Sequence, residues 1–225
     1  MLPQTTTNSG LHAFVAEHII SRYGGAGVRA ADLGTGPGAI AARLRTFGCE
    51  VIAVDRTASE FALDVPHVSI DFDQPDFATS LGRASFSLVT AIEVIEHVES
   101  PIGFLRNVGA LLAPGGVAII TTPNVDSLPA RLKFFLTGKI RTMDQHSEPT
   151  HISPIFWDLL ERQLLPRAGV RLREHFVFPP SGYQLSRKRV AQTLARLATF
   201  LPGDALLGDN HVLVIERLND SCGNS

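Results

Sequence analysis

Hydrophobic and polar positions follow two alternating periods along most of the chain. Short apolar runs end in turns, and each is followed by a stretch with apolar residues at helical spacing. The apolar runs are "VRAADL", "CEVIAVD", "HVSID", "FSLVTAI" and "GVAIITTP". Helical periodicity marks the segments between them, such as "AIAARLRTFG" and "PIGFLRNVGALLAPGG". Strands that alternate with helices at this interval predict a parallel sheet covered on both faces.

The two ends of the chain extend this pattern. "LHAFVAEHIISRYGG" has helical spacing and stops at Gly24 and Gly25. Near the other end, "HISPIFWDLLERQLLPRAGV" predicts a helix ending at Gly169, and "RLREHFVFP" and "HVLVIERL" predict two strands joined by a long segment. Such a pair is compatible with antiparallel strands that close the sheet. We therefore expect one doubly wound α/β domain over residues 1–225, mostly parallel with an antiparallel C-terminal strand, and a helical region at 1–27.

Composition and charge narrow the classes of protein. The chain has 225 residues, 44% hydrophobic residues and a net charge of -2, as in an ordinary globular protein. No global positive field is present to recruit nucleic acid, so DNA is not expected as a partner. Cys49 and Cys222 form no disulfide framework or metal spacing, which fits a reducing compartment. We find no secretory signal and no apolar run of roughly 20 residues, so we expect a cytoplasmic protein.

The stretch "AADLGTGPGAIAARL" is the strongest local signal for a ligand. An apolar strand leads into Gly34, Gly36 and Gly38, and an alanine-rich helix start follows. Glycine lets the backbone turn sharply and approach a ligand, and the helix start offers unpaired N–H groups. Asp55, at the end of "VIAVD", is placed to bind a ribose. The glycines alone do not decide between a nicotinamide and an adenosine cofactor, since "GTGPGA" also fits the dinucleotide fingerprint.

Further motifs favour the adenosine cofactor. "ADLGTGPG", "VIAVD", "FSLVTAIEVIEHV" and "LLAPGGVAIITTPN" occur in this order over residues 28–170 and resemble the class I S-adenosylmethionine-dependent methyltransferases. The resemblance implies a Rossmann-like fold with S-adenosylmethionine as cofactor. Gly34 and Gly36 would pass its methionine portion, Asp55 its ribose, and Asp71 with Phe72 its adenine, although Asp73 could replace Asp71. The complete cofactor site that the resemblance implies is Asp32, Gly34, Thr35, Gly36, Gly38, Asp55, Asp71, Phe72 and Ile92.

An acidic cluster follows the fourth apolar run, in "TAIEVIEHVESP". That strand is expected to end near Ile92, at the sheet edge where such folds bind ligands. If a helix starts there, Glu93, Glu96 and His97 face a common point. Two carboxylates and an imidazole suit Mg²⁺, Mn²⁺ or Zn²⁺ better than a soft metal. His151 and His146, in "QHSEPTHISPIFW", are candidates for a fourth ligand.

Three short motifs refine the resemblance. "EVIEHV", "TTPN" and "PTHISP" together look most like the ubiquinone-biosynthesis O-methyltransferases. Small-RNA 2′-O-methyltransferases have a similar Glu-x-x-Glu-His arrangement with a later histidine, and there the set holds a divalent ion. This resemblance implies a metal set of Glu93, Glu96, His97 and His151. Many related methyltransferases carry "EHV" without a metal, and the two interpretations of the cluster stay open.

The candidate catalytic residues are His151, His97 and Glu93. Methyl transfer from the sulfonium is an in-line displacement, so the protein must align the acceptor oxygen and remove its proton. A divalent ion held by the cluster would lower the pKa of a hydroxyl. Without a metal, His151 or His97 would act as the base, since imidazole titrates near neutral pH.

Two segments, 125–151 and 180–210, are expected to bound the acceptor site or to form a lid. Each mixes basic and apolar residues, in "SLPARLKFFLTGKIR" and "LSRKRVAQTLARLATFL". Basic amphipathic helices cover lipophilic substrates or contact membranes, but they also simply pack on their own domain. A small-molecule or lipid-linked acceptor and a peripheral membrane contact are both compatible with these segments. Oligomeric state cannot be read from the sequence.

The prediction is thus an S-adenosylmethionine-dependent methyltransferase that acts on a hydroxyl of a small or lipophilic molecule. A nicotinamide-dependent oxidoreductase would need a Tyr-x-x-x-Lys or similar set, and neither Tyr23 nor Tyr183 is followed by lysine at that interval. RNA 2′-O-methylation is an alternative that the near-neutral charge disfavours. A non-catalytic S-adenosylmethionine-binding regulator is a further alternative, but it would have no need of the Glu/Glu/His cluster.

Overall fold

The computed structural model describes residues 10–57, 61, 63–144, 149–184, 188–198, 200 and 206–218. In this part of the chain, seven strands form one sheet in the order β3-β2-β1-β4-β5-β7-β6. The strands are β1 Arg29–Leu33, β2 Glu50–Asp55, β3 His67–Ser69, β4 Phe86–Ile92, β5 Leu112–Pro123, β6 Val170–Phe178 and β7 Asn210–Arg217. β1 to β5 are parallel, and β7 runs antiparallel to both β5 and β6. The predicted doubly wound sheet with an antiparallel C-terminal strand is confirmed.

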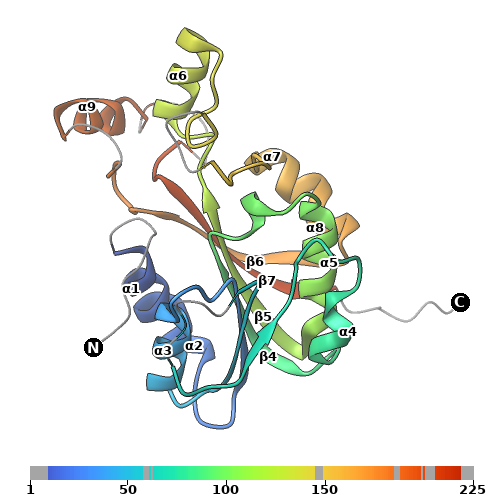
Figure 1. Ribbon diagram of the computed structural model, residues 1–225. Helices are drawn as coiled ribbons and strands as arrows, with labels where there is room; N and C mark the ends of the chain where they lie inside the picture. The colour runs from blue at the N-terminus through green and yellow to red at the C-terminus, as the bar shows by residue number, and fades with distance from the viewer. Residues whose placement is uncertain are drawn as a thin grey trace, which may run out of the picture.

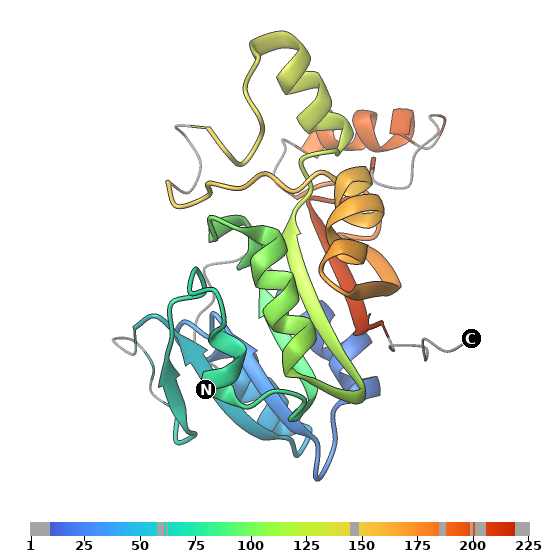
Figure 2. The same cartoon turned by 90° about the vertical axis from the view of Figure 1, so that its right-hand side faces the viewer.

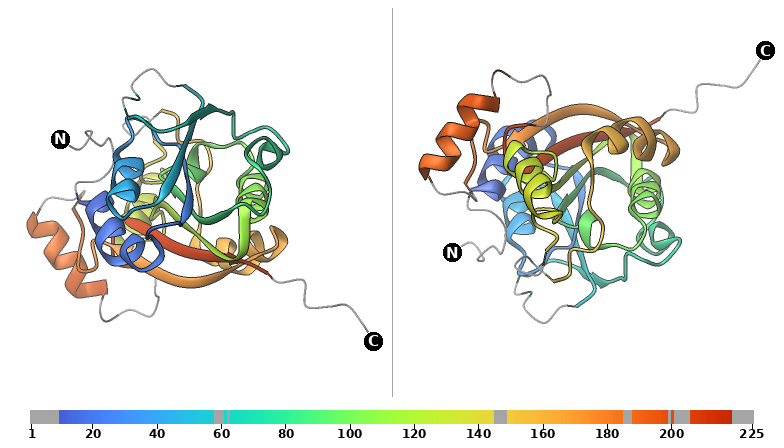
Figure 3. Two further views of the ribbon diagram at one scale, coloured as in Figure 1. Left: turned by 90° about the horizontal axis from the view of Figure 1, so that it is seen from below. Right: turned by 90° about the horizontal axis from the view of Figure 1, so that it is seen from above.

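Helices cover both faces of this sheet (Figures 1 and 3). On one side lie α1, α2 and α3, and on the other α4, α5, α7 and α8. The helical elements are α1 Leu11–Val15, η1 Ala16–Ile20 (a π-helical turn), α2 Ser21–Tyr23, α3 Ala39–Thr46, α4 Phe77–Leu81, η2 Ile95–His97 (a 3₁₀ turn), α5 Pro101–Leu111, α6 Leu128–Thr137, α7 Trp157–Leu159, η3 Leu160–Leu164 (π-helical), α8 Leu165–Arg167 and α9 Lys188–Ala198.

The core consists of two apolar layers that share the sheet. Successive residues of a strand point to opposite faces, so Val117 and Ile119 of β5 pack toward α1 and α3, while Ala118 and Ile120 pack toward α5. Each fully buried aliphatic side chain contributes about 1.5–3 kcal/mol. Burial on both faces explains why the parallel strands are continuous apolar runs.

The segment before β6 differs from its prediction. The helix expected from His151 begins only at Trp157 and continues through α7, η3 and α8 to Arg167. Pro154 disfavours helical backbone at the residue before it, which keeps the preceding stretch extended. Gly169 ends the run in a left-handed conformation, as expected. His151 therefore lies in an extended loop.

Two helices, α6 and α9, lie beyond the end of the sheet, past the carboxyl end of β5 (Figures 1 and 2). They share a small separate apolar cluster formed around Leu128, Tyr183 and Leu206. Arg141 and Asp209 form a largely buried ion pair at 2.9 Å beneath them. Among the described residues, no helix is long and apolar enough to cross a membrane.

Candidate functional site

The glycine turn joins β1 to α3 at the carboxyl edge of the sheet. Gly34 has φ 70° and donates its N–H to the carbonyl of Val54 at 2.8 Å. A Cβ at Gly34 would lie 2.4 Å from Cγ2 of Val94, so both the backbone conformation and the space require glycine. The N–H of Gly36 donates to Oδ2 of Asp55 at 2.8 Å, which ties the turn to the end of β2.

Asp32 lies beneath this turn and is 2% exposed. Its carboxylate accepts hydrogen bonds from the hydroxyls of Thr35, at 2.8 Å, and Thr90, at 2.7 Å. Burial raises the pKa of Asp32 to about 6, and the two hydroxyl hydrogen bonds oppose that rise. In this arrangement Asp32 and Thr35 brace the glycine turn from below.

A cleft of about 370 Å³ opens in front of the turn. Its lining includes Gly34, Asp55, Asp71 and Phe72, four of the residues predicted to bind the cofactor. Asp71 pairs with Arg56 at 3.0 Å, and the ring of Phe72 packs edge-on against those of Phe77 and Phe104. Asp73 lines the same cleft, so the choice between Asp71 and Asp73 stays open.

Ile92 is placed differently from the other predicted cofactor residues. It is 7% exposed, packs in the apolar layer beside α1 and α3, and is not among the residues that line the cleft. Val94, two residues further on, lines the cleft instead.

Glu93 occupies the strand end, but the α-helix expected from it is a single 3₁₀ turn, η2. Glu93 has φ 57°, a left-handed conformation that takes its side chain off the common helical face. Its Oε1 accepts hydrogen bonds from Thr121, at 3.1 Å, and Asn210, at 2.9 Å. Burial raises the pKa of Glu93 to about 7, against the lowering effect of these two hydrogen bonds.

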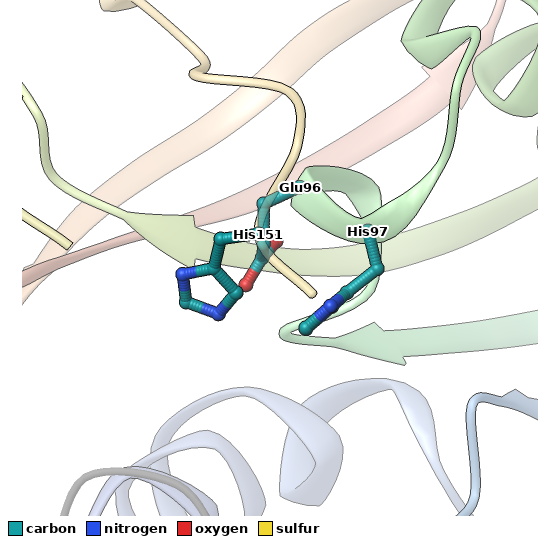
Figure 4. Close-up of side chains that lie close together, drawn as sticks. All are labelled: Glu96, His97 and His151. Carbon is teal, nitrogen blue, oxygen red and sulfur yellow. The ribbon is translucent and has the colours of Figure 1, made fainter. Parts of the chain in front are cut away.

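Glu96, His97 and His151 do come together. Each offers a ligand atom that lies within 4.8 Å of those of the other two. Figure 4 shows Glu96 and His97 reaching from η2 toward His151, which comes from the loop before α7. The two imidazole rings are edge-to-face at 4.7 Å. The structure thus brings together three of the four residues of the expected set, and Glu93, which the helical spacing placed with Glu96 and His97, lies outside the group.

Glu96 is fully buried, and neither carboxylate oxygen has a hydrogen-bond partner among the described residues. Burial, and after it the charge of Glu93, raises the pKa of Glu96 well above its ordinary value. Nδ1 of His97 lies 3.1 Å from the carbonyl of Thr150, and Nδ1 of His151 lies 2.8 Å from that of Thr142. Backbone carbonyls that take one ring N–H leave Nε2 as the lone-pair nitrogen, the arrangement usual for metal-binding histidines. The donor set therefore fits a divalent ion.

Several site residues were not predicted. Thr121 and Asn210 hold Glu93, and Arg56, Val94 and Thr150 line the cleft. Thr121 belongs to the "TTPN" motif, whereas Asn210 carries no local signal because only the sheet topology brings it near β4. His146, the other candidate for a fourth ligand, lies outside the described residues.

Comparisons with known proteins agree with this fold. A solved S-adenosylmethionine-dependent methyltransferase from Archaeoglobus fulgidus superposes with a TM-score of 0.61 at 18% identity, covering 92% of each chain. A ubiquinone biosynthesis O-methyltransferase of Ruegeria pomeroyi is 30% identical over 173 residues, 72% of this chain and 68% of that protein. One from a Bradyrhizobium species is 34% identical over 103 residues, 44% of this chain and 41% of that protein. The chain thus spans about two fifths of several curated relatives.

The fold and the glycine turn define a class I S-adenosylmethionine-dependent methyltransferase. Residues 13–176 match the family described as a methyltransferase domain, and the chain belongs to that family. S-adenosylmethionine is the cofactor that this family implies.

Proposed function

We propose that this protein transfers the methyl group of S-adenosylmethionine to a hydroxyl oxygen of a small or lipophilic molecule. The observation that carries the proposal is one shared cleft. Gly34 and Asp55 line it beside His97 and the loop residue Thr150. The cofactor and the candidate proton acceptor therefore face the same space.

The cofactor is oriented by the turn and by the acids beside it. Oδ2 of Asp55 accepts from the N–H of Gly36, and its Oδ1 accepts only a long 3.5 Å hydrogen bond from the N–H of Thr57. Oδ1 can therefore also accept from ribose hydroxyls. Asp71 and Phe72 supply a polar and an aromatic edge for adenine. The methionine end then lies over Gly34, which has no side chain to obstruct it.

Proton removal from the acceptor falls to the histidines. With Nδ1–H donated to Thr142, His151 directs the basic Nε2 away from its own loop, and His97 is held in the same way by Thr150. Either imidazole can take the hydroxyl proton as the oxygen attacks the methyl carbon. Glu93, held by Thr121 and Asn210, shapes the cleft floor and raises the pKa of Glu96.

A divalent metal is the alternative to a histidine base in this proposal, because a bound ion would occupy the same Nε2 lone pairs. Glu96, His97 and His151 would hold Mg²⁺, Mn²⁺ or Zn²⁺, and the bound ion would lower the pKa of an acceptor hydroxyl. Glu96 supports the idea most directly, because a buried carboxylate without a partner is costly unless a cation or donor meets it.

A lipophilic acceptor is supported by helix α6. Phe135 and Leu136 are 84% and 75% exposed there, at the end of the sheet that carries the site. Exposed large apolar side chains of this kind mark contacts with apolar ligands or surfaces. The ubiquinone biosynthesis relatives named above are consistent with an acceptor of this class.

Two measurements test the proposed function. Calorimetry with S-adenosylhomocysteine and with NAD tests the cofactor, and tighter binding of NAD would refute the proposal. Transfer of a labelled methyl group is then followed with dihydroxybenzenes of short and long alkyl tails and with a short RNA. We expect label on the dihydroxybenzenes, lost in His151→Ala and kept in His18→Ala, a matched change at an exposed histidine. Label on the RNA alone would favour 2′-O-methylation of RNA instead.

A further inference from the structure

Thr122 of β5 and His211 of β7 form a buried polar pair behind the candidate site. The two residues are directly opposite in the antiparallel ladder, so their side chains share one face of the sheet. Both are fully buried. Within the described part of the chain, neither Oγ1 of Thr122 nor Nε2 of His211 has a hydrogen-bond partner. Buried polar atoms of this kind are nearly always satisfied by a neighbour or an ordered water.

The other ring nitrogen of His211 is engaged. Nδ1 lies 3.0 Å from Nε2 of His175 on the neighbouring strand β6. The indole of Trp157 stacks on His175 at 3.7 Å between ring centroids and on His211 at 5.3 Å. Stacking on one side and the sheet on the other hold both imidazoles, so the direction of Nε2 of His211 is set by its surroundings.

On its other side, Thr122 lies toward Glu96. The turn η2, which carries Glu96, packs against β5. The Thr122 hydroxyl lowers the pKa of the Glu96 carboxyl, against the rise caused by burial and Glu93. Four buried polar atoms thus lack a hydrogen-bond partner among the described residues, two on Glu96 and one each on Thr122 and His211.

We propose that Thr122 and His211 are positioning residues for Glu96, joined to it directly or through a buried water in a hydrogen-bond path that continues to His175. The proposal rests on the proposed function, in which Glu96 acts with His97 and His151. It assigns a role to residues that contact neither cofactor nor acceptor. The path holds the carboxylate in the orientation that presents an oxygen to the two histidines.

The chemistry of the groups sets the direction of every hydrogen bond. When a bound cation keeps Glu96 ionised, its carboxylate only accepts, so the hydroxyl of Thr122 donates toward Glu96. The Thr122 oxygen then accepts from Nε2–H of His211. Nδ1 of His211 is left with its lone pair and accepts from Nε2–H of His175, consistent with their separation of 3.0 Å. His211 is therefore the Nε2–H tautomer.

Nitrogen NMR of the full chain labelled on histidine tests the path, both without metal and with Zn²⁺ bound. With Zn²⁺ bound, we expect His211 to be neutral with its proton on Nε2 and that proton to exchange slowly with water, and a proton on Nδ1 would overturn the proposal. In the metal-free chain, Thr122→Val should shift the ring signals of His211, and Thr122→Ser should restore them. No response of His211 to Thr122→Val would overturn the proposal whether or not the protein binds metal.

Calorimetry with Mn²⁺ or Zn²⁺ tests the link to Glu96. Thr122→Val should weaken binding by about 10–100-fold, the usual effect of losing a group that orients a metal ligand, while Thr122→Ser stays close to wild type. His211→Gln, which places an amide N–H near the Nε2 position, should bind better than His211→Asn. Affinity for S-adenosylhomocysteine should not change in any of the four variants.

These results separate the two proposals. Failure of the wild-type chain to bind either ion would count against metal assistance in the proposed function, and the response of His211 to Thr122→Val in the metal-free chain would still decide the path. Wild-type binding with an unchanged affinity in Thr122→Val would refute the positioning role alone.

Discussion

Two buried carboxyl groups lie at neighbouring strand ends, and their surroundings are opposite. Asp32 accepts hydrogen bonds from the hydroxyls of Thr35 and Thr90, all inside one network beneath the glycine turn. Glu96 is as deeply buried, yet neither of its oxygens has a partner among the described residues. A satisfied buried acid stabilises local structure, whereas an unsatisfied one stores a cost that binding can relieve. Under the proposed function, the contrast separates an acid that stabilises local structure from one that acts at the site.

The largest expected effect is on catalysis. Glu96→Gln should lower the rate of methyl transfer by more than about 100-fold, because losing a ligand should exceed the 10–100-fold effect of losing a group that supports one. Asp32→Asn keeps one acceptor oxygen and offers an amide N–H to the other threonine hydroxyl, so it should cost less than about 10-fold. Initial rates at saturating S-adenosylmethionine measure both variants. Equal losses would erase the distinction between the two acids.

The free energy of unfolding should depend more on Asp32 than on Glu96, the reverse of the order expected for catalysis. Asp32→Ala leaves the Thr35 hydroxyl without its acceptor and the Thr90 hydroxyl with only the carbonyl of Ala31 at 3.5 Å. At about 1–3 kcal/mol for each weakened hydroxyl, the free energy of unfolding should fall by about 3 kcal/mol. Urea denaturation measures this change. The double variant Asp32→Ala with Thr90→Val should recover part of the lost free energy of unfolding. It removes the Thr90 hydroxyl, which the single variant leaves without its short hydrogen bond. Additive losses would show that the network is not the cause.

The pH dependence of the free energy of unfolding should reveal the titration of the Asp32 carboxyl. Its pKa is about 6 in the folded protein against an ordinary value of 3.8, so between these values the folded state keeps a proton that the unfolded state has released. Stability from this group is complete below about pH 4 and falls by on the order of 3 kcal/mol as pH rises through 6. Unfolding at pH 4 and pH 7 should show this difference between wild type and Asp32→Asn. A parallel pH profile for the two proteins would contradict it.

The smallest effect concerns the cost stored at Glu96. Glu96→Met should change the free energy of unfolding by no more than about 1 kcal/mol, because the gain from removing a buried carboxyl group is offset by the loss of its proposed Thr122 donor. Glu161→Met, at an exposed position, should stay within about 0.5 kcal/mol and serves as the control. Thermal denaturation without added metal is the measurement. A much larger loss of stability in Glu96→Met would mean that Glu96 has partners beyond the Thr122 path.

The sequence predicted most of the fold because its signals are local. Each parallel strand is a continuous apolar run followed by a helical stretch, and the observed sheet follows from that alternation. The helix begins at Trp157 and not at His151, because Pro154 disfavours helical backbone at the residue before it. The apolar periodicity of the segment does not show this local restriction.

The site was predicted less completely, for reasons of distance along the chain. Glu96 and His97 are adjacent, and His151 was found by its motif, so their grouping could be expected. Glu93 is drawn away by Thr121 and Asn210, residues of β5 and β7 that no spacing rule connects to it. The pairing of Thr122 with His211 likewise depends on strand register, which the sequence alone does not contain.

The position of β7 has a consequence for synthesis. This strand follows the others in chain order, yet it lies between β5 and β6. β1 to β5 can therefore pair with one another before β7 is made. β6 can join the sheet only after β7 is made, because β7 is its neighbour. Asn210 and His211 arrive with that strand, so Glu93 and Thr122 meet their partners only after the rest of the sheet has been made. Assembly of the site therefore depends on the strand of the sheet that is made last.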